Sequence, residues 1–87
     1  MRRAMAIPDL ESRVKRILTN RLGIPAPDIT RDAKLVDDLG MDSLDAVELA
    51  IATEREFKVE VSDEQIAKLR TVADIIALVE RVSEAPA

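Results

Sequence analysis

Apolar residues recur at helical spacing near the start of this 87-residue chain. They lie three and four residues apart, which is the pattern of a helix with one buried face. The stripe consists of Leu10, Val14, Ile17, Leu18 and Leu22. Pro8 and Asp9 favour a helix start, Gly23 favours a left-handed stop, and Pro25 prevents the helix from resuming. The pattern predicts a first helix from about Pro8 or Asp9 to Leu22.

The stretch from about Ile24 to Met41 shows no helical period. It contains two prolines, Gly40 and scattered aspartates, which are residues that favour turns. An irregular loop of this length is uncommon in a small domain and is often functional. We expect four apolar side chains to pin the loop to the core: Ile29, Leu35, Val36 and Leu39.

A second helix is expected from Asp42 or Ser43 to Phe57, with Asp42 as its N-cap. This helix has two apolar faces at about 100° per residue. The larger face is expected to point to the core and comprises Ala46, Leu49, Ala50, Thr53 and Phe57. The opposite face comprises Leu44, Val47 and Ile51, with Glu48, Glu54 and Arg55 around it. That face is either an exposed docking site with a charged rim or is covered by the long loop or the third helix.

Two shorter segments complete the pattern. Ser62 and Gln65 have the spacing of a capping box and predict a short third helix to about Leu69. A similar start at Thr71 predicts a last helix to about Val82, with Val72, Ile75, Ile76, Val79 and Val82 facing inward. The expected fold class is therefore all-α, a four-helix bundle with a long first loop and a short third helix. We expect residues 1–7 to be a flexible leader, 8–82 the domain and 83–87 a flexible tail.

The amino-acid composition argues against several classes of function. The chain has no Cys and no His, which removes the usual zinc ligands, thiolate nucleophiles and imidazole bases and argues against a self-sufficient enzyme. One aromatic residue, Phe57, argues against a nucleic-acid binder that stacks bases. No apolar run is long enough to span a membrane, and we expect a soluble, cytoplasmic chain. The aspartates at 37, 38, 42 and 45 do not have the spacing of a calcium loop, so no dedicated metal site is expected.

The net charge of −4 is unevenly distributed. Residues 1–22 carry six basic and two acidic side chains, whereas residues 23–64 carry four basic and twelve acidic ones. An acidic middle is either a solvated surface or a region that attracts basic partners.

One segment carries a specific motif. Asp38-Leu-Gly-Met-Asp-Ser-Leu-Asp45, followed by Val47-Glu-Leu49, resembles the signature of the acyl carrier protein (ACP) family. Asp-Ser-Leu alone is a weak signal. The resemblance is specific because Phe57 and Asp63-Glu64 also lie where the family has them, and because it extends from about Leu10 to Val82.

The resemblance implies a four-helix bundle in which Ser43 carries a 4′-phosphopantetheine arm. A separate phosphopantetheinyl transferase adds the arm from coenzyme A, and acyl groups are carried as thioesters on its terminal thiol. The chain is then a carrier in fatty-acid or related lipid or polyketide biosynthesis, and not an enzyme. Asp42 lies beside the attachment point, at a helix start that favours a phosphate. The small residues of the core face of the second helix leave volume that either a guest acyl chain or neighbouring side chains fill.

Partner contacts carry over by position. The residues that match partner-facing positions of the family are Leu44, Asp45, Val47, Glu48, Ile51 and Glu54. The implied partners are enzymes with basic patches: the transferase and acyl-ACP synthetases, ketosynthases or acyltransferases. Electrostatic attraction of this kind speeds encounter and permits release. The carrier is expected to be a monomer.

Several positions depart from the pattern of bacterial fatty-acid carriers, which are more acidic. They are Met41, Thr53, Arg55, Lys58 and Ser62, and they favour a specialised carrier over the housekeeping one. Two other interpretations remain open. The first is a peptidyl or aminoacyl carrier. The second is an unmodified helical interaction module in which Ser43 is an ordinary helix-start serine.

Overall fold

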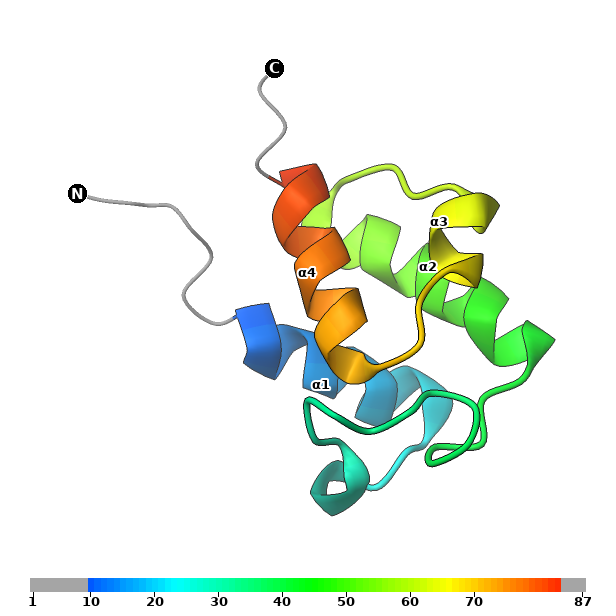
Figure 1. Ribbon diagram of the computed structural model, residues 1–87. Helices are drawn as coiled ribbons and strands as arrows, with labels where there is room; N and C mark the ends of the chain where they lie inside the picture. The colour runs from blue at the N-terminus through cyan, green and yellow to red at the C-terminus, as the bar shows by residue number, and fades with distance from the viewer. Residues whose placement is uncertain (1–9, 84–87) are drawn as a thin grey trace.

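A computed structural model describes residues 10–83, which form a small helical bundle (Figure 1). Its elements are α1 (Leu10–Leu22), the 3-10 turn η1 (Ala26–Asp28), α2 (Ser43–Phe57), α3 (Asp63–Ala67) and α4 (Val72–Ser83). The part of the chain so described contains one isolated β-bridge, between Lys34 and Thr71, and no strand. The predicted all-α bundle with a long first loop and a short third helix is confirmed. The expected leader, the predicted start of the first helix at Pro8 or Asp9, and residues 84–87 of the expected tail lie outside the described residues. Ser83, which was expected to begin the tail, is the last residue of α4.

Helix ends follow the predicted stop and start residues. Gly23 has φ 72°, and its N–H donates to the carbonyl of Thr19 at 3.1 Å, while the Ile24 N–H donates to that of Leu18 at 3.2 Å. These bonds satisfy carbonyls that the end of α1 would otherwise leave unpaired. The predicted left-handed stop is therefore confirmed.

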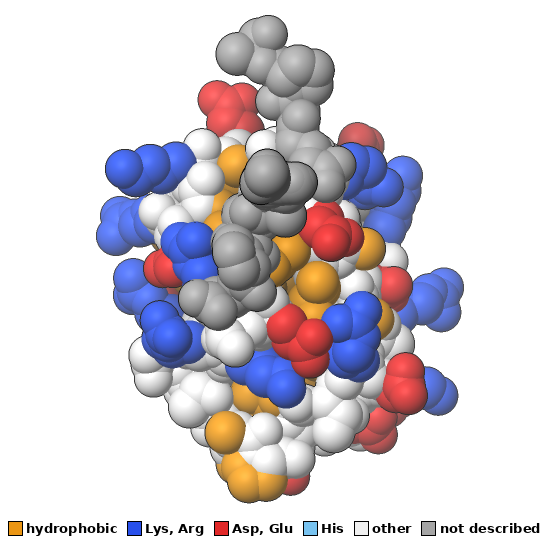
Figure 2. All heavy atoms as spheres, turned by 90° about the vertical axis from the view of Figure 1, so that its left-hand side faces the viewer, with side chains coloured by type: hydrophobic (Ala, Val, Ile, Leu, Met, Phe, Trp, Pro, Cys, Tyr) orange, Lys and Arg blue, Asp and Glu red, His pale blue; other side chains and the backbone are white. Residues whose placement is uncertain are grey.

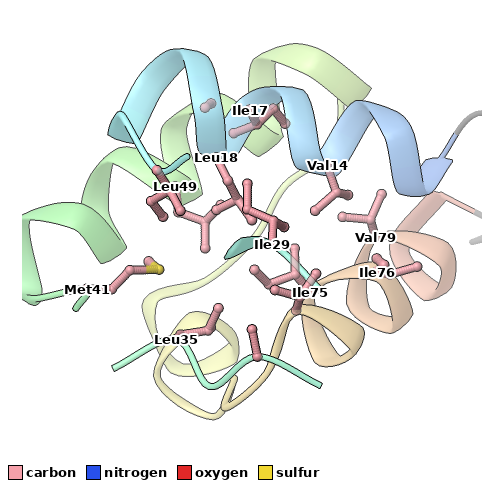
Figure 3. Close-up of a cluster of buried hydrophobic side chains, with 14 of the residues drawn as sticks. Val14, Ile17, Leu18, Ile29, Leu35, Met41, Leu49, Ile75, Ile76 and Val79 are labelled. Carbon is pink, nitrogen blue, oxygen red and sulfur yellow. The ribbon is translucent and has the colours of Figure 1, made fainter. Parts of the chain in front are cut away.

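An aliphatic core fills the space between α1, α2, α4 and the loop (Figure 3). Leu18, Val72 and Val79 are 0% exposed. Burying one such side chain contributes about 1.5–3 kcal/mol relative to exposure. The long loop joins this core through Ile24, Ile29, Ala33, Leu35 and Met41. A smaller cluster beneath α3 comprises Ala50, Val61, Ile66 and Leu78.

Two expectations about side chains and helix bounds are wrong. Val36 was expected to pin the loop, but its side chain is 67% exposed. In the turn that it occupies, Leu35 is buried and Leu39 half-buried, so these two provide the anchoring. The third helix ends at Ala67, before the expected Leu69, because i to i+3 bonds from Lys68 to Gln65 and from Leu69 to Ile66 tighten the chain.

Backbone bonds tie the loop to the start of α4. The Leu35 N–H donates to the Arg70 carbonyl at 2.8 Å, and the Val72 N–H donates to the Ala33 carbonyl at 3.1 Å. The Ala73 N–H donates to the Arg31 carbonyl at 2.9 Å. The loop is thus held by ladder-like pairing although it forms no sheet.

A capping box lies at the start of α4. Asp74 Oδ2 accepts from the N–H groups of Arg70 at 2.9 Å and Thr71 at 3.1 Å, and Thr71 Oγ1 accepts from the Asp74 N–H at 3.3 Å. The bond from the Arg70 N–H, followed by that from Thr71, lowers the pKa of Asp74 below its ordinary value because these donors stabilise the ionised carboxylate.

The free energy of unfolding should depend less on pH in the acid range when this carboxylate is replaced. We expect Asp74→Ala to lower the free energy of unfolding by about 1 kcal/mol at pH 7, the usual effect of a lost cap. Because the pKa of Asp74 is lowered in the folded state, its contribution is complete above the ordinary value of 3.8 and is lost as the pH falls through the folded-state pKa. The gap between variant and parent should therefore narrow in acid.

Urea unfolding followed by far-ultraviolet circular dichroism provides the measurement, since the chain has no Trp or Tyr. Glu80→Ala, which removes an exposed carboxylate from the same helix, is the control. A gap for Asp74→Ala that stays constant down to pH 3 would contradict the assignment.

Candidate functional site

Ser43 is the first residue of α2 and its side chain is exposed. The preceding residue, Asp42, has an extended backbone and caps the helix. Its Oδ1 accepts from the Asp45 N–H at 2.9 Å, and Asp45 Oδ2 accepts from the Asp42 N–H at 3.2 Å. The predicted cap is confirmed, and it is a reciprocal capping box that fixes the backbone on either side of the serine.

The Asp-Leu-Gly part of the motif builds the turn that leads into this helix. Asp38 Oδ2 accepts from the Lys34 N–H at 2.8 Å, and the Gly40 N–H donates to the Val36 carbonyl at 3.0 Å. Gly40 has φ 70°, a conformation that a side chain disfavours, although open space surrounds the position. Backbone geometry therefore favours glycine at this position. Met41 follows with its side chain buried, which anchors the chain just before the site.

The surroundings of Ser43 are better suited to exposing its hydroxyl group to another molecule than to activating that group as a nucleophile. Asp42 and Asp45 are committed to the capping box, and the chain contains no His or Cys. The first backbone N–H groups of an α-helix have no intrahelical acceptor, and the helix dipole is positive at this end. Those of Ser43 and Leu44 are therefore available to an anion bonded to the serine. Within residues 10–83, no three carboxylates are grouped to hold a metal ion.

A pocket of about 410 Å³ opens beside Ser43 between the loop, α2 and α3. Its apolar walls come from Leu35, Val36, Met41, Ala46, Leu49, Ile66, Ala67 and Leu69, and its polar edge from Asp42 and Ser43. Ala46 lines the pocket, whereas Ala50 packs against the smaller cluster beneath α3 and Thr53 is buried outside the pocket. Of the small residues expected to leave volume, Ala46 is therefore the one that lines this pocket, beneath the first turns of α2.

The second apolar face of α2 is exposed. The side chains of Leu44, Val47 and Ile51 are 78%, 55% and 41% exposed, so neither the loop nor α3 covers them. The alternative in which the loop or the third helix covers this face is therefore wrong. Figure 2 shows a different side of the molecule, away from the start of α2, where Lys and Arg side chains lie along both edges of the view with Asp and Glu side chains between them.

The three carboxylates of this face all have internal partners. Asp45 belongs to the capping box, and Glu54 Oε2 accepts from the Val61 N–H at 3.0 Å. Glu48 lies 3.7 Å from the Arg21 guanidinium of α1. Sequence reasoning missed Arg21 because it lies on another helix, far from α2 along the chain, and missed Val61 because its contact is made by a backbone N–H in the link after α2.

An all-helical domain that presents an unactivated serine at a helix start, beside an apolar pocket and an exposed apolar face, has the features of a carrier. Residues 12–79 match the family model described as a phosphopantetheine attachment site.

Three curated relatives are each named acyl carrier protein. That of Akkermansia muciniphila is 45% identical over 78 residues, covering 90% of this chain and 98% of the relative. That of Solidesulfovibrio magneticus is 48% identical over 69 residues, with 79% and 88% covered. That of Thermotoga maritima is 44% identical over 73 residues, with 84% and 90% covered.

The chain therefore belongs to the acyl carrier protein family, whose members are carriers rather than catalysts. Membership implies an acyl carrier role and a covalently attached 4′-phosphopantetheine. The exposed serine at a capped helix start, with a pocket beside it, fits that group. Carriers of this family interact with a phosphopantetheinyl transferase and with biosynthetic enzymes. None of the helices in residues 10–83 is long and apolar enough to cross a membrane.

Loss of the cap at Asp42 should loosen the start of α2. We expect Asp42→Ala to lower the free energy of unfolding by about 1 kcal/mol and to speed hydrogen exchange of the Asp45 amide, which loses its acceptor. Asp42→Asn keeps a side-chain oxygen and should behave much more like the parent. Amide exchange measured by nuclear magnetic resonance checks both variants, and equal protection of Asp45 in all three chains would contradict this role for the cap.

Proposed function

We propose that Ser43 is the residue that carries the 4′-phosphopantetheine arm, and that the chain delivers acyl thioesters on this arm to biosynthetic enzymes. The observation that carries the proposal is the position of Ser43, exposed on the first turn of α2 beside an apolar pocket, in a chain whose match to the attachment-site family spans residues 12–79. Three other serines, Ser12, Ser62 and Ser83, lie outside the Asp-Ser-Leu motif.

Attachment requires an outside enzyme. The Ser43 oxygen forms a bond to the pantetheine-side phosphorus as the phosphoanhydride bond of coenzyme A breaks, adenosine 3′,5′-bisphosphate departs as the leaving group, and the hydroxyl proton goes to a base. Since Asp42 and Asp45 are held in the capping box, the base is expected to come from the transferase. What this chain contributes is an accessible oxygen and a helix start whose N–H groups and dipole favour the resulting phosphodiester. When bound, the arm supplies the thiol that the chain lacks.

The pocket beside Ser43 supports an acyl cargo over an aminoacyl one. Its walls are aliphatic apart from the edge formed by Asp42 and Ser43. Burial of hydrocarbon contributes about 0.8 kcal/mol per CH₂ group, whereas burial of an unpaired ammonium is costly. Fatty-acid or related lipid or polyketide biosynthesis is therefore proposed as the setting, with the peptidyl or aminoacyl carrier as the alternative. Thr53 lies outside the pocket, so this departure does not alter its lining.

The exposed face of α2 is proposed as the partner-binding surface. It combines the apolar side chains of Leu44, Val47 and Ile51 with the carboxylates of Asp45, Glu48 and Glu54. An apolar centre with a charged rim is the usual anatomy of a docking site. The partners are a phosphopantetheinyl transferase and acyl-ACP synthetase, ketosynthase or acyltransferase enzymes with basic patches. We further propose a cytoplasmic monomer in which residues 8–82 form the carrier domain.

Attachment at Ser43 can be tested by intact-mass spectrometry. Incubation with coenzyme A and a broad-specificity phosphopantetheinyl transferase should add one phosphopantetheine to the parent chain and none to Ser43→Ala. Ser62→Ala removes the other helix-start serine and is the matched control, which should be modified as the parent is. A parent chain that stays unmodified, or a Ser43→Ala variant that gains the arm, would refute the proposal. The first result would leave an unmodified interaction module.

The partner surface can be tested at its most exposed side chain. We expect Leu44→Ala to raise the KM of the transferase about 5- to 30-fold, which corresponds to about 1–2 kcal/mol of lost contact. Its unfolding free energy should stay within about 0.5 kcal/mol of the parent's, because Leu44 contributes nothing to the core. Glu80→Ala on α4 is the control for an exposed substitution elsewhere. An unchanged KM for Leu44→Ala would contradict the proposed surface.

A further inference from the structure

The carboxylates of the partner-binding surface differ in what they bond to. Asp45 and Glu54 accept hydrogen bonds from backbone N–H groups, at 3.2 Å from Asp42 and 3.0 Å from Val61. A backbone N–H orients a carboxylate and leaves its full negative charge in place. Glu48, in contrast, lies 3.7 Å from the guanidinium of Arg21, which carries a compensating positive charge. Of the three carboxylates, Asp45 and Glu54 therefore keep their full negative charge, whereas that of Glu48 is offset. The exposed Arg55 at the rim adds a positive charge that is the same in every variant compared below.

Arg21 reaches this position from another helix. It occupies the last turn of α1, where a basic side chain also interacts favourably with the helix dipole. Its side chain and that of Glu48 are both about half exposed, so the pair lies on the surface, within reach of a docked partner. At 3.7 Å the contact is a loose ion pair, and exposed pairs of this kind contribute only about 0–1 kcal/mol. Arg21 can therefore exchange its contact when a partner arrives.

We propose that Arg21 is a specificity-determining residue of the partner-binding surface, acting by offsetting Glu48. This inference rests on the proposed function of that surface. A partner whose docking patch is uniformly basic finds Glu48 already neutralised and meets a guanidinium at the edge of the apolar contact. A partner that places a carboxylate opposite Arg21, among its basic residues, gains a second ion pair there. The surface thereby favours partners of mixed charge and weakens attraction to purely basic ones.

Another ion pair, between the long loop and α1, provides a matched comparison. Arg31 lies 2.8 Å from Glu11, and this contact is the main reason that the pKa of Glu11 is lowered. Replacing Arg31 by Gln changes the net charge by the same amount as replacing Arg21 by Gln. Glu11 lies in the first turn of α1 and Arg21 in the last, about 15 Å apart along a helix that rises 1.5 Å per residue. Arg31→Gln therefore controls for the change in net charge away from the partner-binding surface.

The test measures phosphopantetheinylation of the parent, Arg21→Gln, Arg31→Gln, Glu48→Gln and the double variant Arg21→Gln/Glu48→Gln. The probe is a phosphopantetheinyl transferase with a basic docking surface, assayed at low and at physiological salt. We expect Arg21→Gln to raise kcat/KM about two- to five-fold at low salt, through KM, and to steepen the loss of rate with added salt. Arg31→Gln should change kcat/KM by much less. In the Glu48→Gln background, the gain from Arg21→Gln should shrink to that of Arg31→Gln.

Each other result has a definite meaning. Equal effects of Arg21→Gln and Arg31→Gln would overturn the inference, since net charge alone would then explain both. A gain from Arg21→Gln that persists undiminished without Glu48 would also overturn it, because Arg21 would then act independently of that carboxylate. Both results occur with a chain that is modified normally, so the proposed function would stand. A chain that is not modified in any variant would overturn the proposed function together with this inference.

Discussion

The site depends on the backbone pairing between the long loop and the start of α4. The loop has no helix or strand of its own beyond the turn η1, so its peptide groups need partners elsewhere. The bonds from Leu35 to Arg70, Val72 to Ala33 and Ala73 to Arg31 supply them and bury Leu35 between the two segments. The Met41 N–H then donates to the Leu35 carbonyl at 2.9 Å, which fixes where α2 begins. The position of Ser43 is thus determined by contacts some thirty residues away along the chain.

This arrangement separates the packed core from the exposed attachment site. The core beneath the site is aliphatic, and Leu18, Leu49 and Val72 are almost completely buried. Above it, Ser43 and Leu44 remain exposed at the first turn of α2. The capping box of Asp42 and Asp45 joins the two regions, because it uses side chains next to the serine to satisfy backbone groups and leaves the serine oxygen unencumbered. A carrier needs this combination, since its attachment point must fit several enzymes without changing its own backbone.

Features encoded locally could be predicted from the sequence. The end of α1, the bounds of α2, the stop at Gly23, the cap at Asp42 and the capping box at Ser62 depend on residues within one helical turn, and all are confirmed. Periodicity also predicted the burial of Val72, Ile75, Ile76 and Val79 on α4, although it missed Leu78, which is buried in the smaller cluster. Side-chain directions in the loop could not be predicted this way, and Val36 was assigned to the core wrongly. A loop has no period to separate its inward positions from its outward ones.

The charge pattern of the surface could not be predicted from the sequence for a related reason. Counting charges indicated an acidic middle of the chain, in which Asp45, Glu48 and Glu54 of α2 count as full negative charges. The fold brings Arg21 from α1 to Glu48 and the Val61 N–H to Glu54, and only the first of these contacts changes the charge that a partner meets. The potential of a docking surface is therefore a tertiary property. Carriers with similar motifs can present different potentials when a single basic residue on a neighbouring helix is placed against α2.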